Sequence, residues 1–422
     1  MQFRILLLSS VLLLSCPLIV YGQNGGDDDE LLYRKVRLAL IPGLSTNGLD
    51  APRYEAKYSL NVLMGYNGAL TGYELGFVNI NRVYARGIQM GGAHISGGET
   101  LGVQLAGLGT VSKTDMRGVQ ISGWGNISGG DMQGLQFAGL INRGYELQGM
   151  QSAGVANISR MEMQGIQSAG VLNFVNGSMQ GIQAAGVANF ASKEMEGIQA
   201  AGIANITRDQ LGISAAGVLN ITGRMQGIQI GTVNMTERGQ GMQIGVINMG
   251  REFQGLPVGL ISYYGDGRKN IDIWTGDGGF THVGLNLGTR RIYNMVSAGY
   301  NPLINDRDVW AIGWTIGSYQ TLDERWDRPA LEDYFSTKDL SIQRIFDDGW
   351  SRTPNVMYSY RYLLGRNFSG GAVYAGPTAN LLVSQVEGSS DYTWYSLIDG
   401  TISDRDVRFW IGLSAGFRLF NQ

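Results

Sequence analysis

The segment GIQAAGVAN at residues 181–189 is followed, at residues 197–205, by GIQAAGIAN. Variants of this phrase recur along the chain, and successive copies start 14 to 16 residues apart. Such a short period is the signature of an architecture that stacks equal units. It predicts a repeat region over residues 72–262. The leading glycines of the copies are Gly72, Gly87, Gly102, Gly118, Gly134, Gly149, Gly165, Gly181, Gly197, Gly212, Gly227, Gly241 and Gly255.

Each copy alternates as a short strand does. The residue after the leading glycine is apolar or aromatic, the second is usually Gln, and the third is apolar or small. Successive side chains of a strand lie on opposite faces, so we expect the apolar residues to be buried and the Gln to point the other way. Small residues such as Ala184, Ser168 and Ala200 predict thin packing between two sheets. A second glycine, an apolar pair and an Asn follow, and we expect the Asn outward or at a corner.

The spacing between Gln and Asn varies by one residue among the copies. It is six residues from Gln183 to Asn189 but five from Gln229 to Asn234. In one continuous strand this change would turn every later side chain to the other face. The pattern therefore favours two short arms that meet at the central glycine, so that each copy is one coil of a β-solenoid. A long antiparallel sheet, with turns such as residues 160–162 and 192–194, is the alternative.

Stacked coils would place Gln above Gln and Asn above Asn, so we expect hydrogen-bonded amide ladders along the stack. Amides are poor general acids and bases, which favours a structural role. Corners also explain the abundance of glycine, because a corner needs positive φ or close backbone approach. The ladder residues expected in the regular copies are Gln167, Gln183, Gln199, Gln229, Gln243, Asn157, Asn173, Asn189, Asn205, Asn220, Asn234 and Asn248.

Composition restricts the class of protein. Of 422 residues, 64 are Gly, 16% are charged and 10% are aromatic. A disordered chain would be rich in charge and poor in aromatics. The formal net charge of -3 and the lack of a basic patch argue against nucleic-acid binding. The single Cys excludes an intrachain disulfide and a cysteine-based metal cluster.

The N-terminus is typical of an exported protein. Residues 1–22 read as a signal peptide, with Arg4 before the apolar residues 5–20. The alternative is a lipobox, LLSC at residues 13–16, which would lead to acylation of Cys16. Residues 23–35 read as an acidic linker, and residues 36–71 as lead-in β-strands.

Residues 263–422 show longer alternating stretches, rich in Tyr and Trp and separated by charged loops. Strands of about ten residues with aromatic ends are typical of an outer-membrane barrel. The terminal stretch FWIGLSAGFRLF, residues 409–420, alternates and closes on an aromatic residue. The fold class predicted is therefore all-β: a solenoid of 14–16-residue coils followed by an antiparallel barrel-like domain. A soluble sandwich or half-barrel that caps the solenoid is the alternative. The strands expected are residues 270–275, 281–287, 293–300, 309–317, 340–345, 355–364, 372–383 and 407–420.

Several motifs resemble the bacterial surface-repeat-containing proteins over nearly all of the exported chain. They are IPG and STNG at residues 41–43 and 45–48, SLNVL and GYNG at 59–63 and 65–68, GLPVGLIS at 255–262, RIYN at 291–294 and AGP at 375–377, besides the repeats. The resemblance implies export and a surface or outer-membrane location in a Gram-negative-type bacterium. It implies no reaction, substrate or catalytic residue.

No catalytic, cofactor-binding or metal-binding residue is predicted. His94 occupies an Asn position of an early copy and His282 lies in an alternating strand, so both are expected to be structural. The function expected is a non-enzymatic structural or binding protein of the cell surface or outer membrane. Its partners would be envelope components and a surface glycan or protein ligand, without nucleic acid. The alternatives are an outer-membrane pore and a glycan-active solenoid enzyme.

Overall fold

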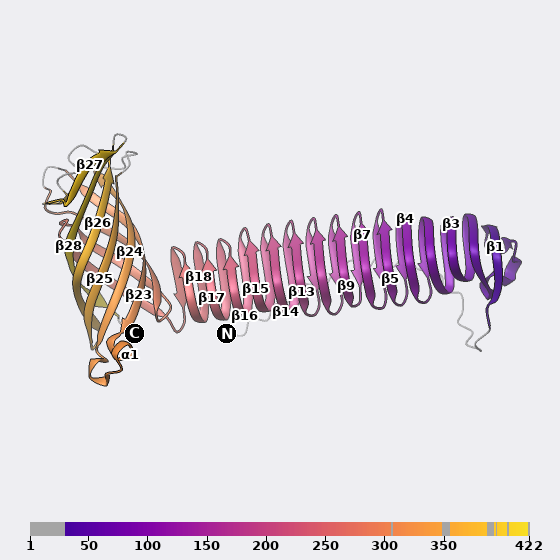
Figure 1. The fold of residues 1–422 in the computed structure, drawn as a ribbon, viewed down its shortest axis with the longest axis horizontal. Helices are drawn as coiled ribbons and strands as arrows, with labels where there is room; N and C mark the ends of the chain where they lie inside the picture. The colour runs from indigo at the N-terminus through magenta and orange to yellow at the C-terminus, as the bar shows by residue number, and fades with distance from the viewer. Residues whose placement is uncertain are drawn as a thin grey trace.

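The computed structural model describes residues 30–304, 307–347, 355–385, 392–393, 395–402 and 405–420. The predicted signal peptide, Cys16 and most of the acidic linker lie outside the described residues. The chain folds into a parallel β-solenoid of about 11 turns and a closed eight-stranded antiparallel barrel. The solenoid is a long rod and the barrel stands at its end (Figure 1). The all-β prediction, with a solenoid before a barrel, is confirmed.

The solenoid starts before the first repeat. Its first strand, β1 (Leu32–Ile41), lies partly within the stretch expected to be linker and pairs in parallel with β3 (Tyr54–Ser96). Between them lie β2 (Leu44–Ser45) and the 3-10 helix η1 (Gly48–Arg53). The remaining solenoid strands are β4 (Thr100–Ser112), β5 (Met116–Ser122), β6 (Gly125–Ser128), β7 (Met132–Ala138), β8 (Ile141–Gly144), β9 (Leu147–Ala153), β10 (Ala156–Ser159), β11 (Met163–Ala169), β12 (Leu172–Val175), β13 (Met179–Ala185), β14 (Ala188–Ala201), β15 (Ala204–Ala216), β16 (Leu219–Ile230), β17 (Val233–Ile244), β18 (Ile247–Val258) and β19 (Ile261–Tyr264).

Equivalent residues of successive copies pair in parallel. Gly165 lies beside Gly181 where β11 pairs with β13, and Asn173 lies beside Asn189 where β12 pairs with β14. Strands that pair in this way, one coil apart, rule out the antiparallel alternative. Each copy of the repeat therefore forms one coil, and the coils stack with equivalent residues in register.

The variable spacing is absorbed at the corner, as predicted. β13 ends at Ala185, and β14 begins only at Ala188. In the shorter copy Ile230 still pairs with Ala215, and the next arm still pairs in register from Val233. The residue that the shorter copies lack is thus a corner residue, and both arms keep their inward and outward faces.

The two glycines of a copy divide between them the two roles expected of a corner glycine. Positive φ occurs at the leading glycines from Gly87 to Gly255, inside the first arm, and is 128° at Gly181. A Cβ on Gly181 would lie 2.0 Å from the carbonyl oxygen of Gly165 in the preceding coil. The central Gly186 has no positive φ, but its Cβ would lie 2.1 Å from the oxygen of Gly170. Glycine is therefore needed at the corner because two backbones approach closely there. At the leading position, inside the first arm, it is also needed because φ is positive.

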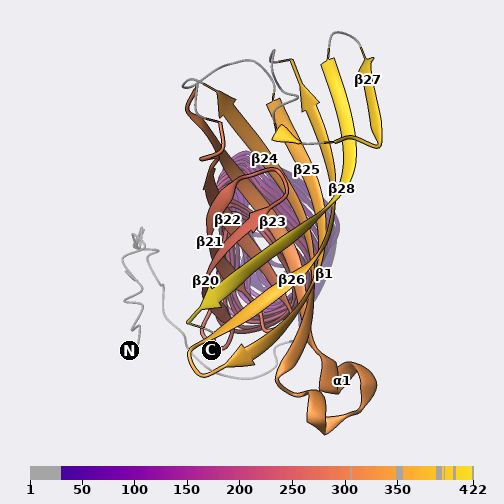
Figure 2. The same ribbon diagram turned by 90° about the vertical axis from the view of Figure 1, so that its left-hand side faces the viewer.

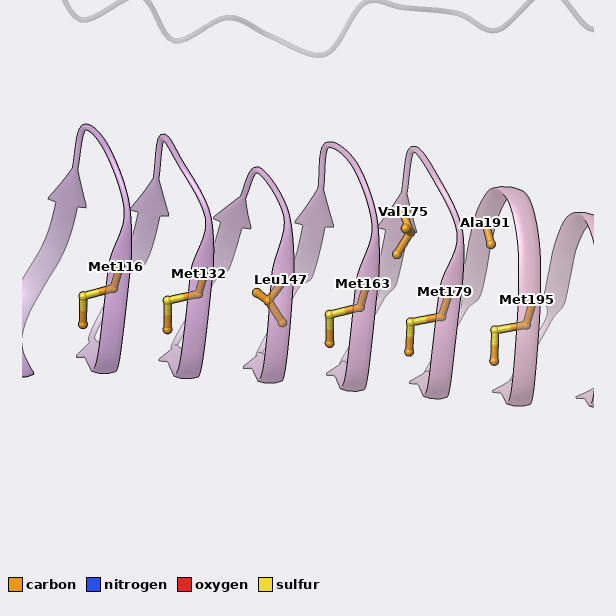
Figure 3. Packing of buried hydrophobic residues seen from close by; sticks show 8 residues of the cluster. All are labelled: Met116, Met132, Leu147, Met163, Val175, Met179, Ala191 and Met195. Carbon is orange, nitrogen blue, oxygen red and sulfur yellow. The ribbon is translucent and has the colours of Figure 1, made fainter. Parts of the chain in front are cut away.

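The expected orientation of the side chains is wrong. The Gln and Asn residues point into the solenoid and are buried, whereas the apolar residues beside the Gln, such as Ile166, Ile182 and Ile198, lie on the outer surface. The small residues Ser168, Ala184 and Ala200 also lie outward, where they line an open groove rather than the core. The inward apolar contribution comes from a position two residues before the leading glycine. Figure 3 shows this row stacked within the coils: Met116, Met132, Leu147, Met163, Met179 and Met195.

The barrel contains all eight expected strands. They are β20 (Arg268–Gly276), β21 (Thr281–Gly288), β22 (Ile292–Tyr300), β23 (Val309–Thr321), β24 (Tyr334–Asp347), β25 (Asn355–Phe368), β26 (Gly371–Ser384) and β28 (Arg405–Leu419). Neighbours pair antiparallel, and β28 pairs with β20 to close the barrel. The sequence reading missed the short β27 (Ile398–Ile402), helix α1 (Leu322–Trp326) and the 3-10 helix η2 (Pro329–Leu331).

The last coil of the solenoid rests against the outer wall of the barrel. Trp314 of β23 donates from Nε1 to the carbonyl oxygen of Gly259 at 2.8 Å. Asn294 of β22 donates from Nδ2 to the oxygen of Pro257 at 2.8 Å and to Oγ of Ser262 at 2.9 Å. Figure 2, which looks from the barrel along the rod, shows the solenoid coils behind the barrel strands.

Candidate functional site

The Gln side chains form a ladder inside the solenoid. Each donates from Nε2 to Oε1 of the Gln in the preceding coil, for example Gln183 to Gln167 at 2.9 Å and Gln199 to Gln183 at 2.8 Å. Since one amide is both donor and acceptor, a row of them satisfies itself without water. The ladder continues without a break from Gln199 back to Gln89.

Each end of the Gln row is closed by a side chain that supplies the missing hydrogen-bond acceptor or donor. In the first repeat Glu74 takes the Gln position, and Oε2 of this acceptor-only carboxylate receives Nε2 of Gln89 at 2.8 Å. At the other end Tyr264, which can donate, gives its hydroxyl hydrogen to Oε1 of Gln243 at 2.6 Å. The first and last members of the row are therefore satisfied as well.

The Asn side chains form a second ladder of opposite direction. Nδ2 of Asn157 donates to Oδ1 of Asn173 in the following coil at 2.9 Å, and Asn173 donates likewise to Asn189. The second hydrogen reaches a backbone oxygen at the corner, as in the bond from Asn157 to Ser168 at 2.6 Å. The row ends at Ser262, where Asn294 of the barrel also donates. The amide dipoles of the two ladders therefore point in opposite directions along the rod.

One coil departs from the pattern. Ser214 stands where its neighbours have Gln, and Oε1 of Gln199 is buried without a partner. Gln210, in the usual Met position of that coil, accepts from Nε2 of Gln229 at 3.2 Å. In this coil Gln210 supplies the amide from the Met position, and the short Ser214 at the usual Gln position leaves room for it.

The N-terminal coils contain a buried charged cluster. Glu74 accepts hydrogen bonds from Asn61, Asn67, Asn81 and Gln89 at 2.7 to 2.9 Å, and Arg37 donates to Asn61 at 2.9 Å. Burial raises the pKa of Glu74, against the hydrogen bonds and the positive charge of Arg37. The four partners of the carboxylate are amide side chains of the same or an adjacent coil, so the buried charge is held by the rod itself.

His94 takes the place of a ladder Asn, as the sequence indicated. Its Nδ1 lies 3.1 Å from Nδ2 of Asn79, and its Nε2 lies 2.8 Å from the carbonyl oxygen of Leu105. The neutral tautomer with hydrogen on Nε2 reproduces the accepting and donating pattern of an Asn amide. Burial lowers the pKa of His94, which favours this neutral form.

Charged and polar side chains share the interior of the barrel with two clusters of buried apolar and aromatic residues, one around Trp410 and one around Phe335. Arg418 of β28 pairs with Asp272 of β20 through two bonds of 2.7 Å, across the strands that close the barrel. Arg361 pairs with Asp339 at 2.8 Å, and both residues are buried. His282 is also buried and lies 3.0 Å from Oε1 of Gln343. A cavity of about 50 Å³ remains beside His282, enough for one or two waters.

This arrangement contains no recognisable catalytic constellation among the described residues. His94 and His282 both contact amide or backbone groups, and neither is paired with a Ser or Cys nucleophile. No group of three His, Cys, Asp or Glu within the described ranges could hold a metal ion. No helix in the described part of the chain has the length and apolar character needed to cross a bilayer.

No family model matches the chain, and it matches neither a curated protein nor a solved structure. The resemblance to the surface-repeat proteins therefore rests on the quoted residues, and the functional conclusion has to come from the geometry. The feature that this geometry brings forward, and that the sequence reading missed, is the outward apolar surface. The sequence contained a signal for this orientation. Met163, Met179 and Met195 each lie four residues before a ladder Gln in the same strand, so alternation places them on the same face as the Gln.

Proposed function

We propose that the chain is a non-enzymatic structural protein of the bacterial outer membrane, anchored by its C-terminal barrel. The observation that carries this proposal is the polarity of the barrel. Its interior holds buried ion pairs such as Arg418–Asp272, whereas outward residues such as Leu340, Val373 and Leu413 are apolar and exposed. Eight-stranded barrels that cross outer membranes have this reversed polarity, with side chains filling the lumen.

The strand lengths agree with this proposal. A strand needs about 9 to 11 tilted residues to cross a bilayer. β22 has 9 residues, β23 has 13, and β24, β25 and β26 have 14 each. The strands β20 and β21, with 9 and 8 residues, lie next to the solenoid junction.

Membrane fractionation with gel mobility tests the anchor. We expect the protein in the outer-membrane fraction, with an unheated sample that migrates differently from a boiled one, because a folded barrel resists detergent at room temperature. Recovery in the soluble fraction, with one mobility under both conditions, would refute the proposal. Conductance of vesicles that contain the folded protein is expected to stay at baseline, since ion pairs fill the lumen.

The charged turns of the solenoid are the surface that we propose for envelope partners, glycan or protein. They carry ion pairs such as the exposed Arg224 with the half-buried Asp209, at 2.5 Å, and Arg238 with Glu252, both exposed, at 3.5 Å. Exposed charges contribute little to stability, so they are free to serve recognition. We expect a ligand on a glycan and protein array to lose binding when Arg224 and Arg238 become Gln. Binding that is indifferent to this change would place recognition elsewhere.

A further inference from the structure

The outer surface of the solenoid divides into one charged edge and two apolar flanks. Every Asp, Glu, Lys and Arg between residues 102 and 262 lies within the six positions before a leading glycine. Most lie in or beside the turn that joins two coils, whereas Arg143 lies in β8 between Ile127 and Ile158 of the neighbouring coils. None lies between a leading glycine and the Asn that follows it. We call these turns, of which residues 192–194 are one, the charged edge.

The apolar flanks are continuous. One flank carries the residue after the leading glycine, and Ile166, Ile182 and Ile198 are 42%, 42% and 43% exposed. Because successive coils pair in register, these side chains form an unbroken row along the rod. A second exposed row lies at the corner position, where Thr232 is the one polar member. Its apolar members are Leu108, Trp124, Leu140, Val155, Val171, Val187, Ile203, Val218, Val246 and Leu260. Soluble monomers rarely expose contiguous apolar patches above about 600 Å².

The flanks need no water to satisfy polar groups. The Gln and Asn amides are paired inside the rod, and each coil pairs its backbone with the coils before and after it. A structure that contacts acyl chains must meet this condition, because an unpaired backbone group in hydrocarbon costs several kcal/mol. The solenoid thus resembles the barrel in that its buried polar groups are paired inside and apolar side chains lie on its outer surface.

The junction places the rod at the level of the barrel wall. Asn294 and Trp314 point to the outside of the barrel, and the last coil covers them there. Their neighbours on the same wall, Val296 and Ile312, are apolar and exposed. Figure 1 shows the axis of the rod running across the barrel strands and not along them. A membrane crossed by these strands would therefore contain the rod in its plane.

We propose that the solenoid between residues 102 and 262 is immersed in the lipid of the membrane that holds the barrel. The flanks contact acyl chains, and the charged edge lies among the headgroups. This inference rests on the proposed outer-membrane anchor. Lipid is the occupant favoured by the continuity of the flanks with the barrel wall and by the concentration of charge at one edge. A second copy would cover a flank without requiring either feature.

Spin labels at single cysteines test the proposal. In full-length protein with Cys16→Ser, labels are introduced through Ile182→Cys on a flank, Ser192→Cys on the charged edge and Leu340→Cys on the barrel wall. The protein is folded into phospholipid vesicles, and collision rates with oxygen and with a nickel chelate are measured. At Ile182 and Leu340 we expect high oxygen and low nickel collision rates. The nickel rate should be several-fold higher at Ser192.

The three sites separate the outcomes. High nickel accessibility at Ile182 with a lipid signature at Leu340 would overturn the immersion of the rod and leave the anchor standing. High nickel accessibility at both would overturn the anchor as well. Low rates for both reagents at Ile182 would mean that protein covers the flank, which would overturn the lipid proposal in favour of self-association.

A matched pair of charged variants gives an independent measurement. Ile182→Lys adds a charge to a flank, and Ser192→Lys adds the same charge to the edge; both positions are exposed. We expect equal strand content in detergent by circular dichroism, because neither side chain is packed inside. In vesicles, Ile182→Lys should lose most of its protease-resistant solenoid, whereas Ser192→Lys should keep it. Equal resistance of the two variants would contradict immersion.

Discussion

At the scale of single residues, the rod depends on positions that accept one side chain for a geometric reason. From Gly87 onward the leading glycines have the positive φ that favours glycine, and a Cβ on any of them would meet a backbone oxygen one coil away. The amides need a partner above and below. These constraints act locally and repeat at each coil, so single substitutions are the direct way to measure them.

Gly181→Ala is expected to destabilise the protein strongly. With φ of 128° and a Cβ that would lie 2.0 Å from the oxygen of Gly165, an L-residue is strained in both torsion and space. The expected loss is about 3 kcal/mol or more in the free energy of unfolding. Urea unfolding followed by circular dichroism measures it. Gly107→Ala is the control: its Cβ would lie 3.9 Å from the nearest atom, the oxygen of Gly91. Equal losses for both variants would refute the argument.

His94 makes the stability of the solenoid depend on pH. Burial lowers the pKa of His94, while the unfolded chain titrates at the ordinary value of 6.5. As pH falls below 6.5, the unfolded state binds a proton that the folded state resists, so the stability present at neutral pH is lost. We expect His94→Asn to keep the ladder and to be less sensitive to acid. The measurement is the difference in unfolding midpoint between the two proteins from pH 8 to pH 5, since His282 is common to both. A constant difference would contradict it.

At the scale of elements, the period predicted the coils, and the Gln-to-Asn spacing located the corner. Orientation could not be predicted in the same way. Alternation shows that Gln183 and Ile182 lie on opposite faces of the strand. It does not show which of the two faces is buried, because that depends on what surrounds the strand. Placing Ile182 inside assumes water outside. The Gln and Asn amides can be buried in place of Ile182, because stacked amides satisfy one another's hydrogen bonds without water. The corner at Gly186 was predictable, since a break there preserves both patterns more simply than a bulge that absorbs the extra residue. The kink at Gly181 was not, because its cause is the oxygen of another coil.

The coil of Ser214 offers a test of the ladder as an element. The double variant Gln210→Met, Ser214→Gln restores the residues of the neighbouring coils and gives Oε1 of Gln199 a donor. We expect it to stabilise the protein by about 1 kcal/mol, the usual net value of one hydrogen bond. Ser214→Gln alone should destabilise, because Gln210 occupies the same space. The unfolding midpoints of the four proteins of the cycle give the coupling, and additive effects would show that the positions are independent.

At the scale of the whole molecule, solenoid and barrel share one design: polar groups are paired inside, and apolar side chains face outward. In the rod the pairing uses neutral amides, while the barrel uses ions such as Arg418 and Asp272. An amide row suits a repeat, since each coil supplies the same group. The barrel has no sequence repeat that could supply such a row. Its opposite charges come from strands far apart in the sequence and meet only when the first and last strands pair. The eight strands could therefore be predicted from alternation, but the pairs within the lumen could not.

The pair that closes the barrel should decide its stability. Asp272 and Arg418 come from the first and last barrel strands and are both buried, with two bonds of 2.7 Å. Asp272→Asn leaves the guanidinium without its counter-charge, and removing one partner of a buried pair costs about 3 to 5 kcal/mol. We expect the folded, fast-migrating form to be lost at a clearly lower temperature on gels.

Glu237→Gln, which breaks the exposed pair with Arg251 at 3.8 Å, is the control and should leave the transition unchanged. Asp272→Leu combined with Arg418→Met removes both charges and should recover much of the loss, because the remaining cost in the single variant is an unpaired buried charge. If Asp272→Asn melts like the control, closure depends on the β20–β28 backbone pairing alone. If the double variant is as unstable as the single one, the pair acts through its hydrogen bonds and not through charge balance.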